Sequence, residues 1–160
     1  MKKYVKWMLG GLLLALVLLQ FSNPARTNPP VLPGRDFLAS NAPPPAVVGL
    51  LRAACYDCHS YESVWPWYSR VAPVSWRVVW HLDDGRKALN FSDWPHDRPD
   101  RERSRYRKIR DTVESSEMPL KDYTWLHPAA RLSETDRQLL VEWADGEAQR
   151  LKTADAGGEK

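Results

Sequence analysis

Cysteine and methionine are scarce in this chain of 160 residues, which holds two cysteines and three methionines. A site that uses both cysteines, Cys55 and Cys58, therefore leaves none for any other site. Because Met1 and Met8 lie near the start, Met118 is the only methionine in the rest of the chain. Strand-like alternation of polar and apolar residues is absent, and so are internal repeats. These absences exclude a repeat protein and a β-sheet fold.

Acidic residues are missing before Asp36, and the basic residues in that stretch include Lys2, Lys3 and Lys6. These three lysines account for the formal net charge of +3, since the rest of the chain has 20 basic and 20 acidic residues. Nucleic-acid binding needs a basic surface on one face. The one basic cluster, residues 98–110, is interleaved with acidic residues, which is typical of a solvated helix face. The charge distribution therefore argues against a nucleic-acid partner.

Residues 1–21 have the pattern of a targeting segment, with three lysines and then an apolar run from Trp7 to Leu19. A cleaved signal peptide should end in a small-residue site, and residues 20–25 make a poor one, which favours an uncleaved signal-anchor. A full span needs ~20 apolar residues, and Tyr4–Phe21 comes close. Lysines before the run keep the N-terminus in the cytoplasm. We therefore expect a domain anchored on the periplasmic side of a bacterial inner membrane, the alternative being a soluble periplasmic protein.

Proline and tryptophan are frequent, with 13 and 8 residues. Residues 22–45 hold a dense group of prolines, which prevents a continuous helix and favours an extended spacer. We predict a proline-rich linker at 22–45, a folded domain at 46–152 and a flexible polar tail at 153–160. Within the linker, residues 35–38 are expected to pack on the surface of the domain.

The domain is predicted to be all-α. Apolar residues at helical spacing indicate helices at residues 46–54, 74–89, 100–115 and 133–151. Ser133 is the expected N-cap of the last helix, with Asp136 three residues further on. The connections at 61–73 and 119–130 are predicted to be long and irregular. The residues expected to face the core are Val47, Leu50, Leu51, Ala54, Val74, Val78, Val79, Leu82, Tyr106, Ile109, Val113, Leu139, Leu140, Trp143 and Leu151.

Residues 55–59 read Cys-Tyr-Asp-Cys-His, the attachment pattern of c-type haem. Thiols at this spacing lie about one helical turn apart and can add to the two vinyl groups of one porphyrin, while His59 becomes the proximal iron ligand. A thioredoxin-like redox pair needs a βαβ context, and a zinc site needs two more ligands. The other histidines are scattered, at His81, His96 and His127. A disulfide stays open as an alternative, but we predict one covalent haem c on Cys55 and Cys58.

A haem iron that only transfers electrons needs a second axial ligand. Methionine sulfur raises the reduction potential, whereas histidine lowers it. Met118 stands before Pro119 in a stiff connection between two predicted helices, which suits a ligand that must be held close to the iron. We predict Met118 as the distal ligand and His81 as the alternative.

Aromatic residues gather after the attachment motif, and a haem needs an apolar, water-poor pocket. We expect haem contacts from Trp65, Trp67, Tyr68 and Trp76. The other ring N–H of His59 needs an acceptor, for which the backbone carbonyls of residues 66–73 are candidates. The candidate partners for the haem propionates are Arg70, Arg77, Arg86 and the arginines of residues 98–110.

Several blocks resemble the bacterial haem-binding domain family of cytochrome c-like proteins, and together they cover most of residues 50–143. After the attachment motif come Trp-Pro-Trp-Tyr at 65–68, Ala-Pro-Val-Ser-Trp at 72–76, Gly-Arg at 85–86, Asn-Phe-Ser-Asp-Trp at 90–94, Glu-Met-Pro at 117–119 and Leu-Ser-Glu-Thr-Asp at 132–136. The resemblance implies a class I-like cytochrome fold around one haem. It implies an early attachment helix, a late methionine loop and a C-terminal helix that closes over the haem.

These features favour a membrane-tethered electron carrier that exchanges electrons with redox partner proteins. A peroxidase-like haem enzyme is the second hypothesis, and it would need an open iron and a distal acid–base residue such as His81 or Glu117. A third is a haem-based sensor or assembly subunit with a labile sixth ligand. Of these three hypotheses we favour the electron carrier over an enzyme.

Overall fold

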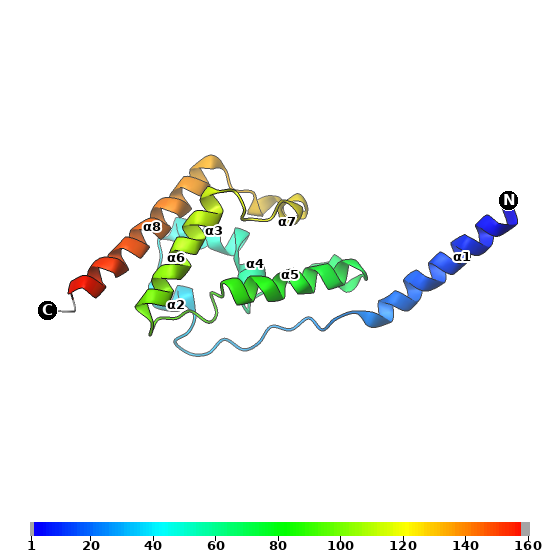
Figure 1. Cartoon of the computed structure of the whole chain (residues 1–160), viewed down its shortest axis with the longest axis horizontal. Helices are drawn as coiled ribbons and strands as arrows, with labels where there is room; N and C mark the ends of the chain where they lie inside the picture. The colour runs from blue at the N-terminus through cyan, green and yellow to red at the C-terminus, as the bar shows by residue number, and fades with distance from the viewer. Residues whose placement is uncertain (1, 158–160) are drawn as a thin grey trace.

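The computed structural model describes residues 2–157, and within that range the protein is all-α, as predicted. The elements in chain order are α1 (Lys2–Leu19), η1 (Gln20–Ser22), α2 (Phe37–Asn41), α3 (Pro45–Ala54), α4 (Tyr56–His59), η2 (Trp67–Arg70), α5 (Val74–Ala88), α6 (Pro99–Glu114), α7 (Lys121–Leu126), η3 (Pro128–Ala130) and α8 (Glu134–Gly157). Figure 1 shows α6 and α8 side by side at one end of the domain and α1 reaching away at the other.

The four helices predicted for the domain correspond to α3, α5, α6 and α8. The expected cap of α8 is present: the Ser133 hydroxyl accepts from the Asp136 backbone at 3.1 Å, and the Asp136 carboxylate accepts from the Ser133 backbone at 3.0 Å. The helix extends to Gly157, so the segment predicted as a flexible tail continues α8 at least that far, and 158–160 lie outside the described residues. The prediction of irregular structure at 119–130 is wrong, because α7 and η3 form there.

The core combines aromatic side chains with aliphatic side chains from α3, α6 and α8. On α6, Tyr106, Ile109 and Val113 are buried as predicted. On α8 the buried stripe is Leu140, Ala144, Ala148 and Leu151, at spacings of three and four residues. Leu139 was expected to face the core but is 37% exposed, because it lies one residue away from that stripe.

The segment predicted as a linker contributes to this core through α2. The Asp36 side chain caps α2 by accepting from the Ala39 backbone at 2.8 Å. Phe37 is fully buried, with its ring 4.5 Å from that of Trp94 and 5.4 Å from that of Phe91. The packed domain therefore begins at Asp36, and Phe37 lies in its centre rather than on its surface.

The chain between α1 and α2 is extended, as its prolines predict, and its first part follows the surface of the domain beneath α5 (Figure 1). Residues 20–28, which we call the strap, are tied to the domain by side-chain hydrogen bonds. The Gln20 amide both donates to the Ala72 carbonyl at 3.1 Å and accepts from the Ala72 backbone at 3.0 Å. Trp76 donates its indole N–H to the Ser22 carbonyl at 3.0 Å. The strap is therefore a docked segment.

Among the described residues, one helical stretch is long and apolar enough to cross a membrane, Lys2–Ser22. It comprises α1 and η1, and none of its side chains is buried in the domain. Its apolar surface is thus available to lipid.

Candidate functional site

The two cysteines lie where α3 gives way to α4. Pro45 starts α3, a position at which its missing N–H costs nothing. Cys55 leaves helical geometry at φ −124° and ψ −43°, and its carbonyl accepts from the His59 backbone at 2.9 Å. This break changes the direction of the chain, so that α4, which carries Cys58 and His59, does not continue the axis of α3. Both cysteines are free thiols.

Both thiols are protonated at neutral pH. Burial, with a smaller contribution from the neighbouring Cys58, raises the pKa of Cys55 to about 12, and burial raises that of Cys58 to about 11. Metal sites need the thiolate form. No cluster of three or more His, Cys, Asp or Glu side chains that could hold a metal ion occurs in residues 2–157.

The imidazole of His59 is held by the C-terminal end of α5. Its Nδ1 lies 2.9 Å from the Gly85 carbonyl oxygen and 3.0 Å from that of Leu89. Because carbonyls only accept, Nδ1 carries the proton and Nε2 keeps a free lone pair. Burial also lowers the pKa of His59, which favours the neutral ring. This is the arrangement of a metal-ligating histidine with its outer N–H satisfied.

The expectation that residues 66–73 accept from His59 is wrong. The acceptors lie at the end of α5: the Gly85 carbonyl, which also accepts from the Leu89 backbone at 2.9 Å, and the carbonyl of Leu89, which follows the last helical residue. Gly85 lets α5 approach closely enough: a Cβ at this position would lie 2.7 Å from the Cys58 carbonyl oxygen. A side chain there would push α5 away from α4. Sequence reasoning identified Gly85 only as part of a family motif, since its role depends on a contact between distant segments.

Arg86, a candidate partner for haem propionates, is already engaged. Its guanidinium donates to the Ser60 carbonyl at 2.8 Å, the Thr27 carbonyl at 2.9 Å and the Asn28 side-chain oxygen at 2.9 Å. It thus joins the strap to the end of the attachment motif. Of the other candidates, Arg77 borders a cavity and pairs with Asp122 at 2.7 Å.

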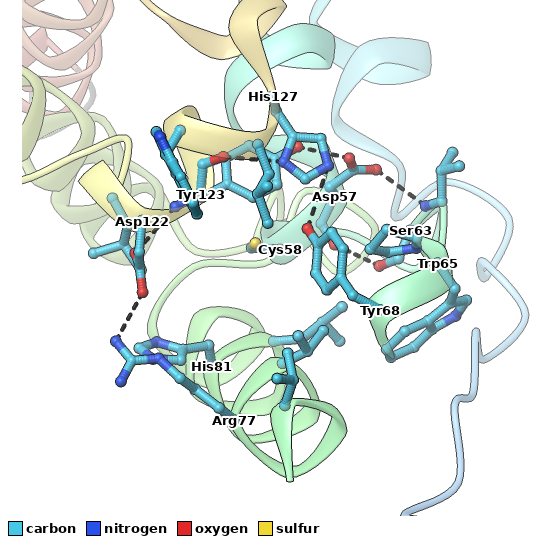
Figure 2. A pocket seen from close by; sticks show the side chains of 18 residues that line it. Asp57, Cys58, Ser63, Trp65, Tyr68, Arg77, His81, Asp122, Tyr123 and His127 are labelled. Carbon is cyan, nitrogen blue, oxygen red and sulfur yellow. Dashed lines mark hydrogen bonds and ion pairs between the residues drawn. The ribbon is translucent and has the colours of Figure 1, made fainter. Parts of the chain in front are cut away.

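A cavity of about 350 Å³ lies between α4, α5, α7 and residues 61–73, which we call the aromatic loop (Figure 2). Its size is within the range of small-molecule and cofactor sites. Cys58 lies in its wall, and most of the other lining side chains are apolar or aromatic. The lining residues are Asp57, Cys58, Ser63, Val64, Trp65, Pro66, Tyr68, Val74, Arg77, Val78, His81, Leu82, Leu120, Asp122, Tyr123, Trp125, Leu126 and His127.

Two of the four aromatic residues predicted to contact haem line this cavity, Trp65 and Tyr68. Trp67 and Trp76 do not belong to its lining. Trp67 is 77% exposed, and the indole of Trp76 faces the strap through its bond to Ser22. The structure thus places Trp65 and Tyr68 at the cavity and Trp67 and Trp76 away from it, a separation that the sequence pattern did not make.

The wall formed by α7 was not predicted, although it is held directly to the attachment motif. The Asp57 carboxylate accepts from the Tyr123 hydroxyl at 2.7 Å and from the Val64 backbone at 3.0 Å. The Tyr123 ring stacks on His127, with ring centres 4.0 Å apart. Tyr68 donates to Nε2 of His127 at 3.4 Å, because Nδ1 of that ring is used by the Tyr123 carbonyl (Figure 2). Asp57, one of the two residues between the cysteines, therefore holds the α7 wall of the cavity in place.

The two candidates for the distal ligand are placed differently. His81 lines the cavity, and its Nε2 is buried without a hydrogen-bond partner. Met118 is half-buried and lies outside the lining, although Leu120, two residues on, belongs to it. The Met118 backbone is fixed by a bond from its N–H to Thr112 at 3.0 Å and a bond from Arg137 to its carbonyl at 3.3 Å.

Comparison with known protein families identifies this arrangement. The model of a family described as haem-binding domain matches residues 14–146, which is most of the chain. The chain belongs to the haem-binding domain family. No curated protein and no solved structure matches it.

The residues of this haem-binding domain fit a haem. The apolar cavity has the Cys58 thiol in its wall, and His59, which lies outside the lining, follows Cys58 in the chain with a free lone pair on Nε2. The buried, unpartnered Nε2 of His81 is a polar atom that a bound group in the cavity would satisfy. The protein is therefore a haem-binding protein. Helices α4, α5 and α7 each form one wall of its site.

Proposed function

We propose that this haem-binding domain carries one haem c, linked covalently to Cys55 and Cys58, and acts as a membrane-tethered electron-transfer module. In the attachment, each S–H adds across one vinyl double bond, so that a thioether forms and no atom is lost. The observation that carries the proposal is the state of His59, the residue directly after the second cysteine. Its ring is neutral, is oriented by two carbonyls and keeps a free lone pair on Nε2, and the two cysteines before it are free thiols at the attachment spacing.

His59 is the proximal ligand in this proposal, and Met118 is the distal one. Three features support Met118: its segment borders the cavity through Leu120, its backbone is fixed by Thr112 and Arg137, and its thioether would raise the potential. His81 remains the alternative, supported by its unpartnered Nε2 in the cavity.

The bound haem supplies one-electron chemistry through its iron, and the chain's own residues set the conditions for it. Trp65, Tyr68 and the aliphatic side chains of α5 exclude water from the site, which tunes the potential. Gly85 and Leu89 keep the proton on Nδ1 of His59. Arg77 lies at the cavity and is the candidate to pair with a propionate, in exchange for its exposed ion pair with Asp122. The Arg86 guanidinium is held by the Ser60 and Thr27 carbonyls.

We further propose that α1 and η1 form the membrane anchor and that the domain lies on the periplasmic side of a bacterial inner membrane. The length and apolar character of Lys2–Ser22 support the anchor, and the three lysines at its start support the orientation. A cleaved signal peptide, with a soluble periplasmic domain, is the alternative. Redox partner proteins would then meet the domain in the periplasm.

A peroxidase-like enzyme or a haem-based sensor is the second candidate function. The observation that favours it is His81, which already lies in the cavity as a potential distal acid–base group, whereas Met118 lies outside the lining. In that case the iron would be open to a small ligand.

The absorption spectrum and the reduction potential of the Met118→Ala and His81→Ala variants separate these functions. The carrier proposal predicts that Met118→Ala abolishes the sulfur-to-iron band and strongly lowers the potential, while His81→Ala leaves both nearly unchanged. A wild-type protein that is high-spin and reacts with peroxide would contradict the carrier and support the enzyme. The reverse result for the two variants would assign the distal position to His81.

A further inference from the structure

Large apolar side chains are exposed on η2 and on one side of α5. Trp67 is 77% exposed, Val71 43%, Trp76 39% and Trp80 61%, and we call these four residues the tryptophan face. Trp76 and Trp80 are one helical turn apart and therefore point the same way. The cavity-lining residues Val78 and His81 lie on the other side of α5, so that the tryptophan face is not a wall of the cavity. Exposed apolar surface of this kind indicates an interaction site.

The tryptophan face adjoins the end of the proposed anchor. The paired hydrogen bonds between Gln20 and Ala72, and the bond from Trp76 to Ser22, join η1 to α5 and to the short connection between η2 and α5. Figure 1 shows the C-terminal end of α1 beside the start of α5. The end of the proposed membrane-spanning helix therefore lies next to the exposed tryptophans.

The charged residues of the strap and of η2, which border this face, are basic: Arg26 and Arg70. No acidic residue occurs before Asp36 or between residues 63 and 82. Arg26 donates to the Ser69 carbonyl of η2 at 3.2 Å, whereas Arg35 pairs with Asp93 and Arg77 with Asp122. Tryptophan is enriched where membrane meets water, and arginine near the surface is attracted to anionic phospholipid headgroups. A lipid surface matches both the apolar and the electrostatic character of the tryptophan face.

We propose that the tryptophan face lies on the phospholipid surface around the anchor, and that the strap holds the domain in this orientation. This inference rests on the proposed membrane anchor. The domain is then fixed relative to the bilayer and does not swing on a free stalk. Because the cavity-lining residues of α5 face away from Trp76 and Trp80, a redox partner would approach the haem from the aqueous side.

Photo-crosslinking of the full-length protein in bacterial inner membranes tests this orientation. A photo-reactive amino acid is placed at position 67 or at position 80, and at position 107 as the control, which is exposed on α6 away from α1 (Figure 1). We expect the yield of phospholipid adducts at positions 67 and 80 to be several-fold higher than at position 107. Mass spectrometry of the adducts identifies the crosslinked molecule.

The other outcomes overturn the inference in distinguishable ways. Equal adduct yields at positions 67, 80 and 107 in membrane-bound protein would overturn the lipid contact but leave the anchor intact. An adduct of twice the mass of the chain would mean that a second copy covers the face. Recovery of the protein in the soluble fraction alone would overturn the proposed anchor together with this inference.

Discussion

The two halves of the domain are stabilised in different ways. Around α2, α6 and α8, aromatic rings fill the interior: Phe37 packs against both Phe91 and Trp94, and Tyr106 meets Trp94 with ring centres 5.3 Å apart. Around α4, α5 and α7, by contrast, hydrogen bonds position the walls of a cavity of about 350 Å³. The first half completes its own core, whereas the second leaves a space of cofactor size.

Phe91 connects the two halves. The Phe91 backbone N–H donates to the His59 carbonyl at 2.7 Å, and the Phe91 carbonyl accepts from the Phe37 backbone at 2.8 Å. The Phe91 ring stacks on Tyr56 of the attachment motif, with ring centres 4.9 Å apart. The aromatic core thus acts as a fixed base for α4. In our proposal the haem supplies the missing interior of the other half.

The largest expected effect comes from Trp94→Ala in the aromatic core. It creates a cavity that costs about 3–5 kcal/mol of unfolding free energy, and it removes the 2.8 Å bond to the buried Glu102 carboxylate. The control, Trp67→Ala, removes a side chain that is 77% exposed and should change stability by less than about 0.5 kcal/mol. Denaturant unfolding of the haem-loaded protein measures both. Equal effects would contradict the assignment of the core.

A smaller effect is expected from Gly85→Ala at the boundary between α4 and α5. The new Cβ would meet the Cys58 carbonyl oxygen at 2.7 Å, and the forced separation should cost about 1–3 kcal/mol. Gly49→Ala is the matched control, because it is also within a helix but has no neighbour within 4 Å. That control should stabilise the protein by up to about 1 kcal/mol. Thermal unfolding compares the two, and a change of the same sign in both would refute the close approach.

The smallest effect is expected at the α7 wall. Tyr123→Phe removes the 2.7 Å hydrogen bond to the Asp57 carboxylate, which should cost about 1.5 kcal/mol because the acceptor is charged. Tyr68→Phe removes a 3.4 Å bond to His127 and should cost less, since a bond of that length is weak. The denaturation midpoints of the two variants give the comparison. A larger loss of unfolding free energy for Tyr68→Phe would show that the bond between Tyr123 and Asp57 is not the main contact that holds the α7 wall.

Sequence reasoning succeeded where neighbours in the chain determine the structure. The cap formed by Ser133 and Asp136 and the buried side of α6 follow from spacings of three and four residues. The attachment motif is equally local. The acceptors for His59, the burial of Phe37 and the fastening of α7 by Asp57 all depend on contacts between distant segments. Those contacts have no periodic signature, which explains why they were missed.

The central claim is that Cys55 and Cys58 hold one haem covalently beside His59. It is tested most directly by the intact mass of the protein exported from a bacterial host that has haem-attachment machinery. We predict the mass of the chain, with or without its N-terminal segment, plus that of one haem, and loss of the stable two-bond linkage in Cys58→Ser. An unmodified mass for the wild-type protein under these conditions would contradict the claim.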